Sequence, residues 1–516
     1  MGLSEQLADL AQSLNALKGL HRGIEKESLR VTPDGNLSMR PHPPSLGSAL
    51  AHPAITTDFS EAQLELITAV HDSPDACLNE LQRVHDFVYA NLNDELLWPT
   101  SMPCMVDEDS DIPVGQYGTS NIGMAKTVYR LGLGVRYGRL MQTISGIHYN
   151  FSVTESLWQA LGVTDQQGRT EAYLSLIRNF RRWSWLLIYA FGASPAVCKS
   201  FTRRTDHQLS DLDDGTHYLP YATSLRMGPL GYQSEAQTQL HISYNSIKAY
   251  TDSMVNALTT PYPAYADIGL KDPSGAYQQL STSIIQIENE FYGTIRPKRT
   301  ILKGERPVTA LLTRGVEYVE VRCMDLNPFL PLGIDKETIC FIDTFLMMCL
   351  LADSGPDDVA ESMRLTANQL AVVERGRDPD LTLLRNADES TKLADWAHEL
   401  LGMCAAVAEQ LDRSNDTDSY SQSVKKQSAK VDDPGLTPSA QILTRLSEEE
   451  IPFYRFAMNQ AQSIRTEFAE HPLSGAALEK MRAHAAASLT AQAQAEAADT
   501  VDFEQFLIGY LALPEQ

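Results

Sequence analysis

Acidic side chains recur inside apolar, β-branched segments of this chain, at positions that a folded strand would have to shelter from water. Glu25 and Glu27 lie two residues apart in RGIEKESLRV. Glu320 and Arg322 have the same spacing in GVEYVEVRCMDLNPF. On a strand, residues two apart point to the same face. A buried carboxylate is costly unless a positive group binds it. The pattern therefore predicts an oxygen-lined site on a sheet face, suited to Mg²⁺ or Mn²⁺ and typical of phosphate chemistry.

A third acidic pair, Asp58 and Glu65 in ITTDFSEAQLELIT, has a less regular spacing. At seven positions apart, the two residues would point to opposite faces of a regular strand, so we expect a turn or bulge near 59–61 that brings both inward. Glu61 is a lesser candidate ligand. For any one acidic pair, the more common explanation is an exposed edge strand whose acids pair with Lys or Arg. The repetition of the pattern favours a shared site.

Two further segments predict strands with one polar and one apolar face. In MQTISGIHYNFSVT, residues 141–154, His148 and Asn150 lie on the polar face. In SIIQIENEFY, residues 283–292, the polar face carries two glutamates, a glutamine and Tyr292. A sheet face that is only exposed to solvent tends to carry Lys, Thr and Ser, whereas Glu, His, Asn and Tyr are typical of functional sites.

The predicted secondary structure changes near residue 335, from alternating strands and helices to mostly helices. Residues 412–436 are polar and rich in Ser and Asp, so we expect a mobile loop or linker there. Helical periodicity covers 76–97, 171–194, Thr338–Ala352, Asp358–Arg375 and Thr391–Leu411.

The net charge restricts the partners that we expect for this chain. With a net charge of −24, the chain would be repelled by a nucleic acid or an anionic membrane. The pattern of the first residues predicts an amphipathic helix and not a signal peptide. The longest apolar run, Phe345–Ala352, is far too short to span a bilayer. The cysteines have no metal-binding spacing, so we expect reduced thiols and a cytoplasmic protein. They are Cys77, Cys104, Cys198, Cys323, Cys340, Cys349 and Cys404.

Basic and aromatic side chains lie in segments that we interpret as loops. Such cations can hold a substrate carboxylate or nucleotide phosphates, and Arg does so in a bidentate manner. For each cation alone, surface solvation is the more common explanation. The chain has no P-loop motif, so use of ATP would require metals on a sheet face. IRPKRT supplies Arg296, Lys298 and Arg299, LPYATSLRMGPLGY supplies Arg226 and Tyr232, and VYRLGLGVRYG supplies Tyr129, Arg130, Arg136 and two glycines.

The order of these segments resembles that of the glutamate–cysteine ligases (γ-glutamylcysteine synthetases) of the proteobacterial type. The matching stretches are RGIEKESLRV, ITTDFSEAQLELIT, SMPC, QYGTSN, LMQTISGIHYNFS, FGASPAVC, YLPYATSLR, QIENEFYGTIRPKR and GVEYVEVRCMDLNPF. They cover about residues 19–340, and the total length also fits. The resemblance implies an α+β fold in which a curved antiparallel sheet forms a funnel like that of glutamine synthetase, with helices around it. It implies a catalytic region over residues 1–340 and a mostly helical region over 341–516.

The same resemblance implies roles for individual residues. It implies that Arg322 lies beside the transferred phosphoryl group and that Arg226 binds glutamate; with Glu320, these are the expected catalytic residues. The implied metal-ligand carboxylates are Glu25, Glu27, Asp58, Glu65 and Glu320. The implied substrate contacts are Tyr129, Tyr232 and Tyr292 around cysteine, and His148 and Asn150 near the amino-acid substrate. Arg296, Lys298 and Arg299 are expected to bind nucleotide phosphates.

The implied activity is ATP-dependent ligation of the γ-carboxylate of L-glutamate to L-cysteine through γ-glutamyl phosphate, the first step of glutathione synthesis. Mg²⁺ or Mn²⁺ would neutralise and align the phosphates of ATP, the co-substrate. The resemblance implies a monomer that acts on small molecules. Two alternatives stay open. One is a carboxylate–amine ligase that joins glutamate to a different amine, and the other is a metal-dependent phosphohydrolase or an inactive binding module on this scaffold.

Overall fold

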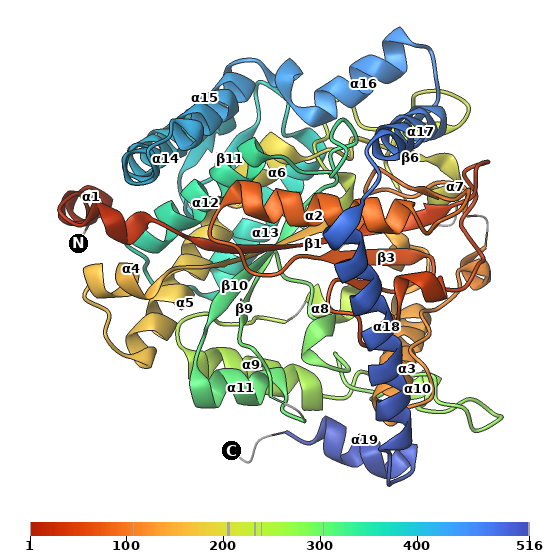
Figure 1. Ribbon diagram of the computed structural model, residues 1–516. Coiled ribbons are helices and arrows are strands. Elements are labelled where there is room, and N and C mark those ends of the chain that lie inside the picture. Colours follow the sequence, from red (N-terminus) through yellow and green to blue (C-terminus); the bar gives the residue numbers. More distant parts are fainter. Residues whose placement is uncertain are drawn as a thin grey trace.

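The computed structural model of the chain describes residues 2–106, 108–203, 207–231, 234–238, 240–302 and 304–513. Its centre is a seven-stranded sheet with the order β2-β3-β1-β5-β10-β9, and β4 pairs with the end of β1 (Figure 1). Every pairing is antiparallel. The sheet does not close, because β2 and β9 remain its edges. The strands are β1 (His21–Val31), β2 (Ile55–Thr57), β3 (Gln63–Ile67), β4 (Leu96–Leu97), β5 (Ile147–Ser152), β9 (Ile295–Lys298) and β10 (Tyr318–Met324).

Helices surround this sheet, so the fold is a mixture of helices and an antiparallel sheet. Most of the expected helices are confirmed within a few residues; the one expected at 171–194 is interrupted at Ser184, and the one expected at 76–97 ends at Tyr89. The helices are α1 (Leu3–Leu10), α2 (Pro74–Tyr89), α3 (Asn121–Tyr137), α4 (Glu155–Ala160), α5 (Gln166–Trp183), α6 (Trp185–Phe191), α7 (Lys199–Thr202), α8 (Glu235–Thr238), α9 (Ile247–Thr259), α10 (Pro263–Ile268), α11 (Pro307–Arg314), α12 (Lys336–Leu351), α13 (Val359–Arg375), α14 (Leu393–Asn415), α15 (Ser419–Asp432), α16 (Pro438–Glu448), α17 (Phe453–Glu470), α18 (Gly475–Ala497) and α19 (Phe503–Leu511). Two small sheets contain β6 (Ala196–Cys198), β7 (Ser210–Asp211) and β8 (Thr216–Tyr218), and β11 (Thr382–Leu384) and β12 (Ser390–Lys392).

One face of the central sheet carries apolar side chains, and helices cover it. Ile24, Tyr149 and Val321 are fully buried in a hydrophobic cluster that also includes side chains of α2, α5, α6 and α12. A buried ion pair ties the sheet to α12, since Arg22 Nη2 lies 2.8 Å from Asp343 Oδ2. The Tyr149 hydroxyl donates to the other oxygen of Asp343 at 2.7 Å. This covered face holds the sheet rigidly and leaves the opposite face for a site.

The polar stretch 412–436 is not the loop that its composition predicted. It completes α14 and then forms α15. Tyr420, Val424 and Val431 are buried on one side of α15. Asp412 accepts two hydrogen bonds from backbone N–H groups in the first turn of α15, both at 2.9 Å. The apolar stripe is narrow, and the Ser- and Asp-rich composition concealed it.

The strand predicted at 283–292 is also wrong. The segment runs irregularly and contains one 3-10 turn, Glu288–Glu290. Its polar side chains bind backbone N–H groups instead of lining a strand face: Glu290 Oε2 accepts from Gln286 N at 2.7 Å, and Gln286 Oε1 accepts from Leu280 N at 2.9 Å. The alternation of polar and apolar residues therefore does not reflect a strand. It arises because the polar side chains of this irregular segment are held individually by backbone N–H groups.

The segment with two glycines near residue 132 is a helix, α3, and not the loop that we expected. Ser120 caps it by accepting a hydrogen bond from Gly123 N at 3.2 Å. Gly132 is needed for close packing, because a Cβ at this position would lie 2.1 Å from Oε1 of Gln286. The glycine therefore indicates a close approach between two segments and not a turn.

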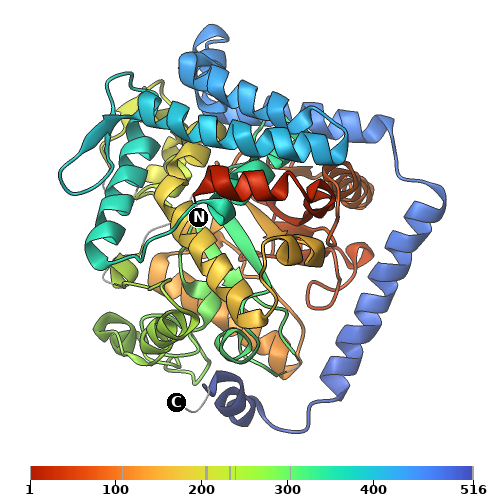
Figure 2. The ribbon, with the colours of Figure 1, turned by 90° about the vertical axis from the view of Figure 1, so that its left-hand side faces the viewer.

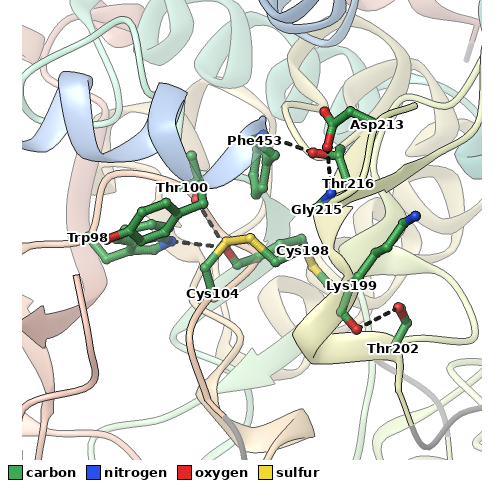
Figure 3. The surroundings of a disulfide bond; sticks show 12 residues. Trp98, Thr100, Cys104, Cys198, Lys199, Thr202, Asp213, Gly215, Thr216 and Phe453 are labelled. Atoms are coloured by element: carbon green, nitrogen blue, oxygen red, sulfur yellow. Dashed lines mark hydrogen bonds between the residues drawn. A yellow bond between two sulfur atoms is a disulfide. The ribbon is translucent and has the colours of Figure 1, made fainter. Parts of the chain in front are cut away.

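Two cysteines form a disulfide, which corrects the expectation of reduced thiols. Cys104 and Cys198 are bonded, with their Cα atoms 5.4 Å apart (Figure 3). Beside them, the indole N–H of Trp98 donates to Met102 O at 2.9 Å. The bond joins the segment after β4 to the end of β6. The other five cysteines are buried thiols.

The C-terminal residues wrap around the outside of the fold. α18 lies along one side of the molecule, and the chain then turns so that α19 lies against α3 (Figures 1 and 2). Only Met481, Ala485 and Ser488 of α18 are buried. We call residues 475–511 the C-terminal strap. In the described ranges, no helix combines the length and apolar character that crossing a bilayer requires.

Candidate active site

A cavity of about 310 Å³ opens on the uncovered face of the sheet. Strand register gathers its acids: Glu27 pairs with Glu65 across β1 and β3, and Glu25 pairs with His148 across β1 and β5. Cross-strand partners on one face have Cβ atoms about 4.5–5.5 Å apart. Glu320 on β10 faces the same cavity. All of these side chains therefore converge from four neighbouring strands.

His148 lies between three of the carboxylates. Its Nδ1 is 3.2 Å from Glu25 Oε2 and 3.8 Å from Glu320 Oε1, and its Nε2 is 3.5 Å from Glu27 Oε1. The side-chain amide of Asn150 donates to Glu25 Oε1 at 2.8 Å. Burial raises the pKa of Glu25, but the hydrogen bond with His148 and nearby charges outweigh burial and lower the pKa overall. Glu25 is therefore held as a carboxylate.

Asp58 and Glu65 face the same cavity because the chain turns between β2 and β3. This turn is the one that their spacing predicted. Among the described residues, neither carboxylate has a cationic side chain within 4.0 Å. Both carboxyl groups therefore face the cavity without a cationic partner among the described residues.

The charges of this cluster oppose one another. Burial, followed by the charges of Glu25, Asp58 and Glu27, raises the pKa of Glu65 well above its usual value. Burial and then the charge of Asp58 also raise the pKa of Glu27. A cation among these groups would remove the repulsion.

The ligand atoms of this cluster are also close enough for a metal. One ligand atom each from Glu25, Glu65 and His148 lies within 4.8 Å of the other two. Carboxylate oxygens are the ligands that Mg²⁺ prefers, and Mn²⁺ also accepts imidazole. The residues thus fit a divalent cation. His148, which we expected near an amino-acid substrate, belongs to the candidate ligand set.

Two cations neutralise Glu320 at another part of the cavity. Arg322 Nη1 lies 3.2 Å from its Oε1, and Lys298 Nζ lies 3.2 Å from its Oε2. Burial raises the pKa of Glu320, but the charges of Lys298 and Arg322 lower it far more, so the net pKa falls. This part of the cavity places two cationic side chains next to the acidic cluster.

Aromatic and apolar side chains complete another part of the wall. Tyr129 comes from α3, and Tyr292 comes from the irregular segment before β9. Gln142 Nε2 donates to the Tyr292 hydroxyl at 3.0 Å. Phe59 and Leu133 lie in the same wall. Such a wall suits a small, weakly polar side chain. Tyr232 lies outside the described residues.

Arg226 and Asn150 do not line the cavity but hold groups that do. Arg226 is fully buried; its Nη2 donates to the backbone oxygen of Arg322 at 3.1 Å, and its Nη1 lies 3.8 Å from Asp325 Oδ1. Asn150 binds Glu25. Both residues act on the site through a neighbour.

Two other candidates point elsewhere. Arg299 Nε lies 3.6 Å from Glu317 Oε2, and Arg299 is not part of the cavity wall, in contrast to Arg296 and Lys298. The prediction of Glu61 as a ligand is wrong. Its two oxygens accept hydrogen bonds from backbone N–H groups of His42 and Gln116, each at 2.8 Å.

Sequence reasoning missed Lys126 and Tyr510, which enter the wall from α3 and α19, and it named Arg130 only as a cation of an expected loop. Lys126, Tyr129, Arg130 and Leu133 have the spacing of one helix face, so a correct helix assignment would have found Lys126 as well. Tyr510 has no sequence signal that joins it to the rest.

The chain matches the family model of glutamate–cysteine ligase over residues 6–372. It is 49% identical to a glutamate–cysteine ligase of Pseudomonas putida (strain W619), over 99% of this chain and 98% of that protein. It is 48% identical to one of Alcanivorax borkumensis, over 97% of each protein.

Two solved structures are also similar. The crystal structure of glutamate–cysteine ligase from Francisella tularensis in complex with AMP has a TM-score of 0.91 and 39% identity, and the match covers 96% of this chain and 98% of that one. A bifunctional glutathione synthetase from Pasteurella multocida has a TM-score of 0.71 and 25% identity, over 90% of this chain and 55% of that one.

Proposed function

This chain belongs to the glutamate–cysteine ligase family, and we propose that the cavity on its central sheet is the site where the enzyme joins the γ-carboxylate of glutamate to the amino group of cysteine. The reaction is the first step of glutathione synthesis and uses ATP. The observation that supports this site most strongly is the cluster of carboxylates beside two cations and an aromatic wall in one cavity.

The acidic cluster is proposed to hold the metal that accompanies ATP. Glu25, Glu65 and His148 would be ligands, with Glu27 and Asp58 close by. Mg²⁺ or Mn²⁺ bound there would neutralise phosphate charge and align the phosphoryl donor with its acceptor. Burial and then neighbouring carboxylates raise the pKa values of Glu27 and Glu65, and a bound cation would offset both effects, which supports this assignment.

The cationic part of the cavity is proposed to receive the phosphoryl group. The γ-carboxylate oxygen of glutamate attacks the γ-phosphorus of ATP, the bond to the bridging oxygen breaks, and ADP leaves. Arg322 and Lys298 would stabilise the charge on the transferred oxygens. Glu320 keeps both cations in place through its two oxygens. Arg226 is proposed to position Arg322 by binding its backbone oxygen.

The aromatic wall is proposed to bind cysteine. The cysteine nitrogen attacks the carbonyl carbon of γ-glutamyl phosphate, a C–N bond forms, and phosphate leaves as the nitrogen loses a proton. Tyr129, Tyr292 and Leu133 would surround the small thiol side chain. Gln142 orients the Tyr292 hydroxyl.

Three finer proposals concern the whole protein. The antiparallel row of strands, with its carboxylates on one face, is the proposed counterpart of the glutamine synthetase funnel, and residues 1–340 are the proposed catalytic region. We also propose a cytoplasmic monomer. One hydrophobic cluster extends from α1 to α18, which supports a C-terminal helical region that is packed on the sheet.

Phosphate release from Mg-ATP tests the function. Release should require both glutamate and cysteine, persist when 2-aminobutyrate replaces cysteine, and be accompanied by a ligated product in mass spectrometry. Alanine and serine should support far less release. Release with a different amine would change the substrate, and release without either amino acid would show a phosphohydrolase.

A further inference from the structure

The end of the C-terminal strap, α19, contacts segments on both sides of the cavity. The two edges of the sheet belong to different sides of the cavity. On the β2 side, Arg130 of α3 donates to the backbone oxygens of Asp58 and Thr57. On the β9 side, Arg306 precedes α11. α19 packs against α3 and is also bound by Arg306, whose Nη1 donates to Leu511 O at 3.1 Å. α19 therefore bridges the two sides.

Several independent contacts fix α19 in this place. Leu507 is buried in a cluster with Ala125 and Val128 of α3. Phe503 packs edge-on against Tyr277, with ring centroids 5.3 Å apart. The backbone of Asn121, at the start of α3, donates to Asp499 Oδ2 at 2.6 Å.

The guanidinium of Arg306, which binds Leu511, also binds a residue next to the cavity wall. Arg306 forms a paired contact with Glu288, at 3.2 Å from Nε and 2.6 Å from Nη2. Glu288 begins the turn that places Asn289 and Glu290 in the cavity wall. The end of α19 is thus anchored to the frame of the active site.

Tyr510 is the residue of α19 that lines the cavity. Its ring packs on Phe506, with centroids 5.5 Å apart. Its hydroxyl makes no hydrogen bond to a described residue, and the residue is only half-buried. The phenol O–H is therefore a donor that can serve a bound molecule.

Two cations of α3, the helix that α19 contacts, line the same cavity as Tyr510. Lys126 and Arg130 follow each other on one face of α3, with their charged groups 5.3 and 4.4 Å from the centre of the Tyr117 ring. Within the described part of the chain, neither has a carboxylate within 4.0 Å. Arg130 instead donates to backbone oxygens. This differs from Arg322 and Lys298, which are both paired with Glu320.

We propose that α19 is part of the active site and that Tyr510, with Lys126 and Arg130, binds an oxyanion of one substrate in the cavity. The oxyanion is a phosphate of ATP or the α-carboxylate of glutamate or cysteine. Both groups accept hydrogen bonds from a phenol and from cations. This inference rests on the proposed function, because it names a further contact of the same site.

The test uses the full-length chain with Tyr510→Phe, Tyr510→Ala and the control Ile508→Ala. Ile508 lies on the same helix and is 74% exposed. Steady-state KM values are measured separately for ATP, glutamate and cysteine. We expect Tyr510→Phe and Tyr510→Ala to raise one of the three KM values about tenfold, because a hydrogen bond to a charged group is lost. Ile508→Ala should leave all three within twofold of the parent values.

The outcomes separate the sources of the oxyanion. A rise for ATP alone assigns a phosphate, and a rise for one amino acid alone assigns its carboxylate. No change in any KM in either variant overturns the proposal. A rise only in Tyr510→Ala also overturns it, since the ring would then act by packing. Should Tyr510→Ala not fold, Tyr510→Phe decides.

Calorimetric binding of Mg-ATP, glutamate and cysteine to the same variants gives a readout that does not depend on turnover. A parent protein that binds these ligands without ligating them would overturn the proposed function. The Tyr510 variants would then still show, through their dissociation constants, whether the α19 contact exists.

Discussion

Glu27 and Glu65 face each other directly across β1 and β3, and burial, followed by the charges of Glu25, Asp58 and Glu27, raises the pKa of Glu65. Directly opposed like charges destabilise a sheet pair. The acidic cluster therefore lowers the free energy of unfolding, and the same carboxylates form a surface that can bind a cation.

Replacing Glu65 by Gln should separate these two effects. We expect Glu65→Gln to raise the free energy of unfolding without divalent cations by about 0.2–1 kcal/mol, because one opposed charge is removed. The same variant should lose at least tenfold in ligase activity and most of the rise in Tm that Mg-ATP gives the parent. The exposed Glu479→Gln on α18 is the control and should change neither quantity. A less stable Glu65→Gln that still responds to Mg-ATP would contradict the assignment.

Gly146 provides a test of Arg226 that does not alter Arg226 itself. A Cβ on Gly146 would lie 2.0 Å from Arg226 Nη2, and the Gly146 N–H donates to Glu27 Oε2 at 2.7 Å. We expect Gly146→Ala to displace both groups, to lower kcat at least tenfold and to cost about 1–3 kcal/mol of stability through overpacking.

The matched control is Gly402→Ala on α14, where no atom lies within 4 Å of the added Cβ. This change should raise stability by about 1 kcal/mol through helix propensity and leave activity unchanged. Chemical denaturation and initial rates measure both variants. Unchanged kcat in Gly146→Ala would remove Arg226 from its positioning role.

Tyr292→Ala should affect cysteine more than glutamate. The ring is part of the aromatic wall, and its hydroxyl is bound by Gln142. Loss of the ring should raise the KM for cysteine about tenfold, since roughly 1–2 kcal/mol of apolar contact is removed. The KM for glutamate should change less than threefold. Equal increases for the two amino acids would place Tyr292 outside the cysteine pocket.

His52 predicts a loss of stability in mild acid. Burial, followed by the charge of His484, lowers the pKa of His52 to about 4. Its Nδ1 accepts hydrogen bonds from the N–H groups of Ala54 and Ile55, at 3.1 and 2.9 Å. The folded state therefore keeps the ring neutral, whereas the unfolded chain takes up a proton near pH 6.5. The stabilising contribution is complete above pH 6.5 and is lost as the pH falls toward 4.

We expect this residue to account for about 1–2 kcal/mol of that loss, which is less than the full pKa shift would give. His52→Asn keeps an acceptor close to the Nδ1 position and does not titrate. Its free energy of unfolding should depend less steeply on pH between 6.5 and 4, as urea denaturation at several pH values would show. An unchanged slope would rule out His52 as the titrating group.

The site was predictable where chemistry follows from spacing within one segment. The pairs Glu25 with Glu27 and Glu320 with Arg322 share a face because strands have a period of two. Asp58 and Glu65 required only a turn. The register that opposes Glu27 to Glu65 depends on contacts between segments, and no pattern within either segment specifies it.

The errors arose from contacts that a local pattern does not record. Gly132 suggested a loop, but its function is to admit the side chain of Gln286, which lies far away in the sequence. The alternating pattern at 283–292 arises from separate side chain–backbone bonds and not from a strand. Tyr510 reaches the cavity only because α18 extends along the molecule. The errors at Gly132 and Tyr510 concern contacts between distant segments, and the error at 283–292 concerns hydrogen bonds within one irregular segment. Local periodicity records neither kind of contact.

The disulfide has a consequence for how this site assembles. Cys104 and Cys198 enclose a covalent ring of the chain that contains α3 and β5, and therefore Tyr129 and His148. In an oxidised unfolded chain, α3 and β5 already belong to one closed loop. The search that brings Tyr129 and His148 into one cavity therefore begins with part of its loop-closure entropy removed. Assembly of the cavity should thus be faster from the oxidised chain than from the reduced one. The redox state in which the polypeptide matures would then influence how quickly a working cavity forms.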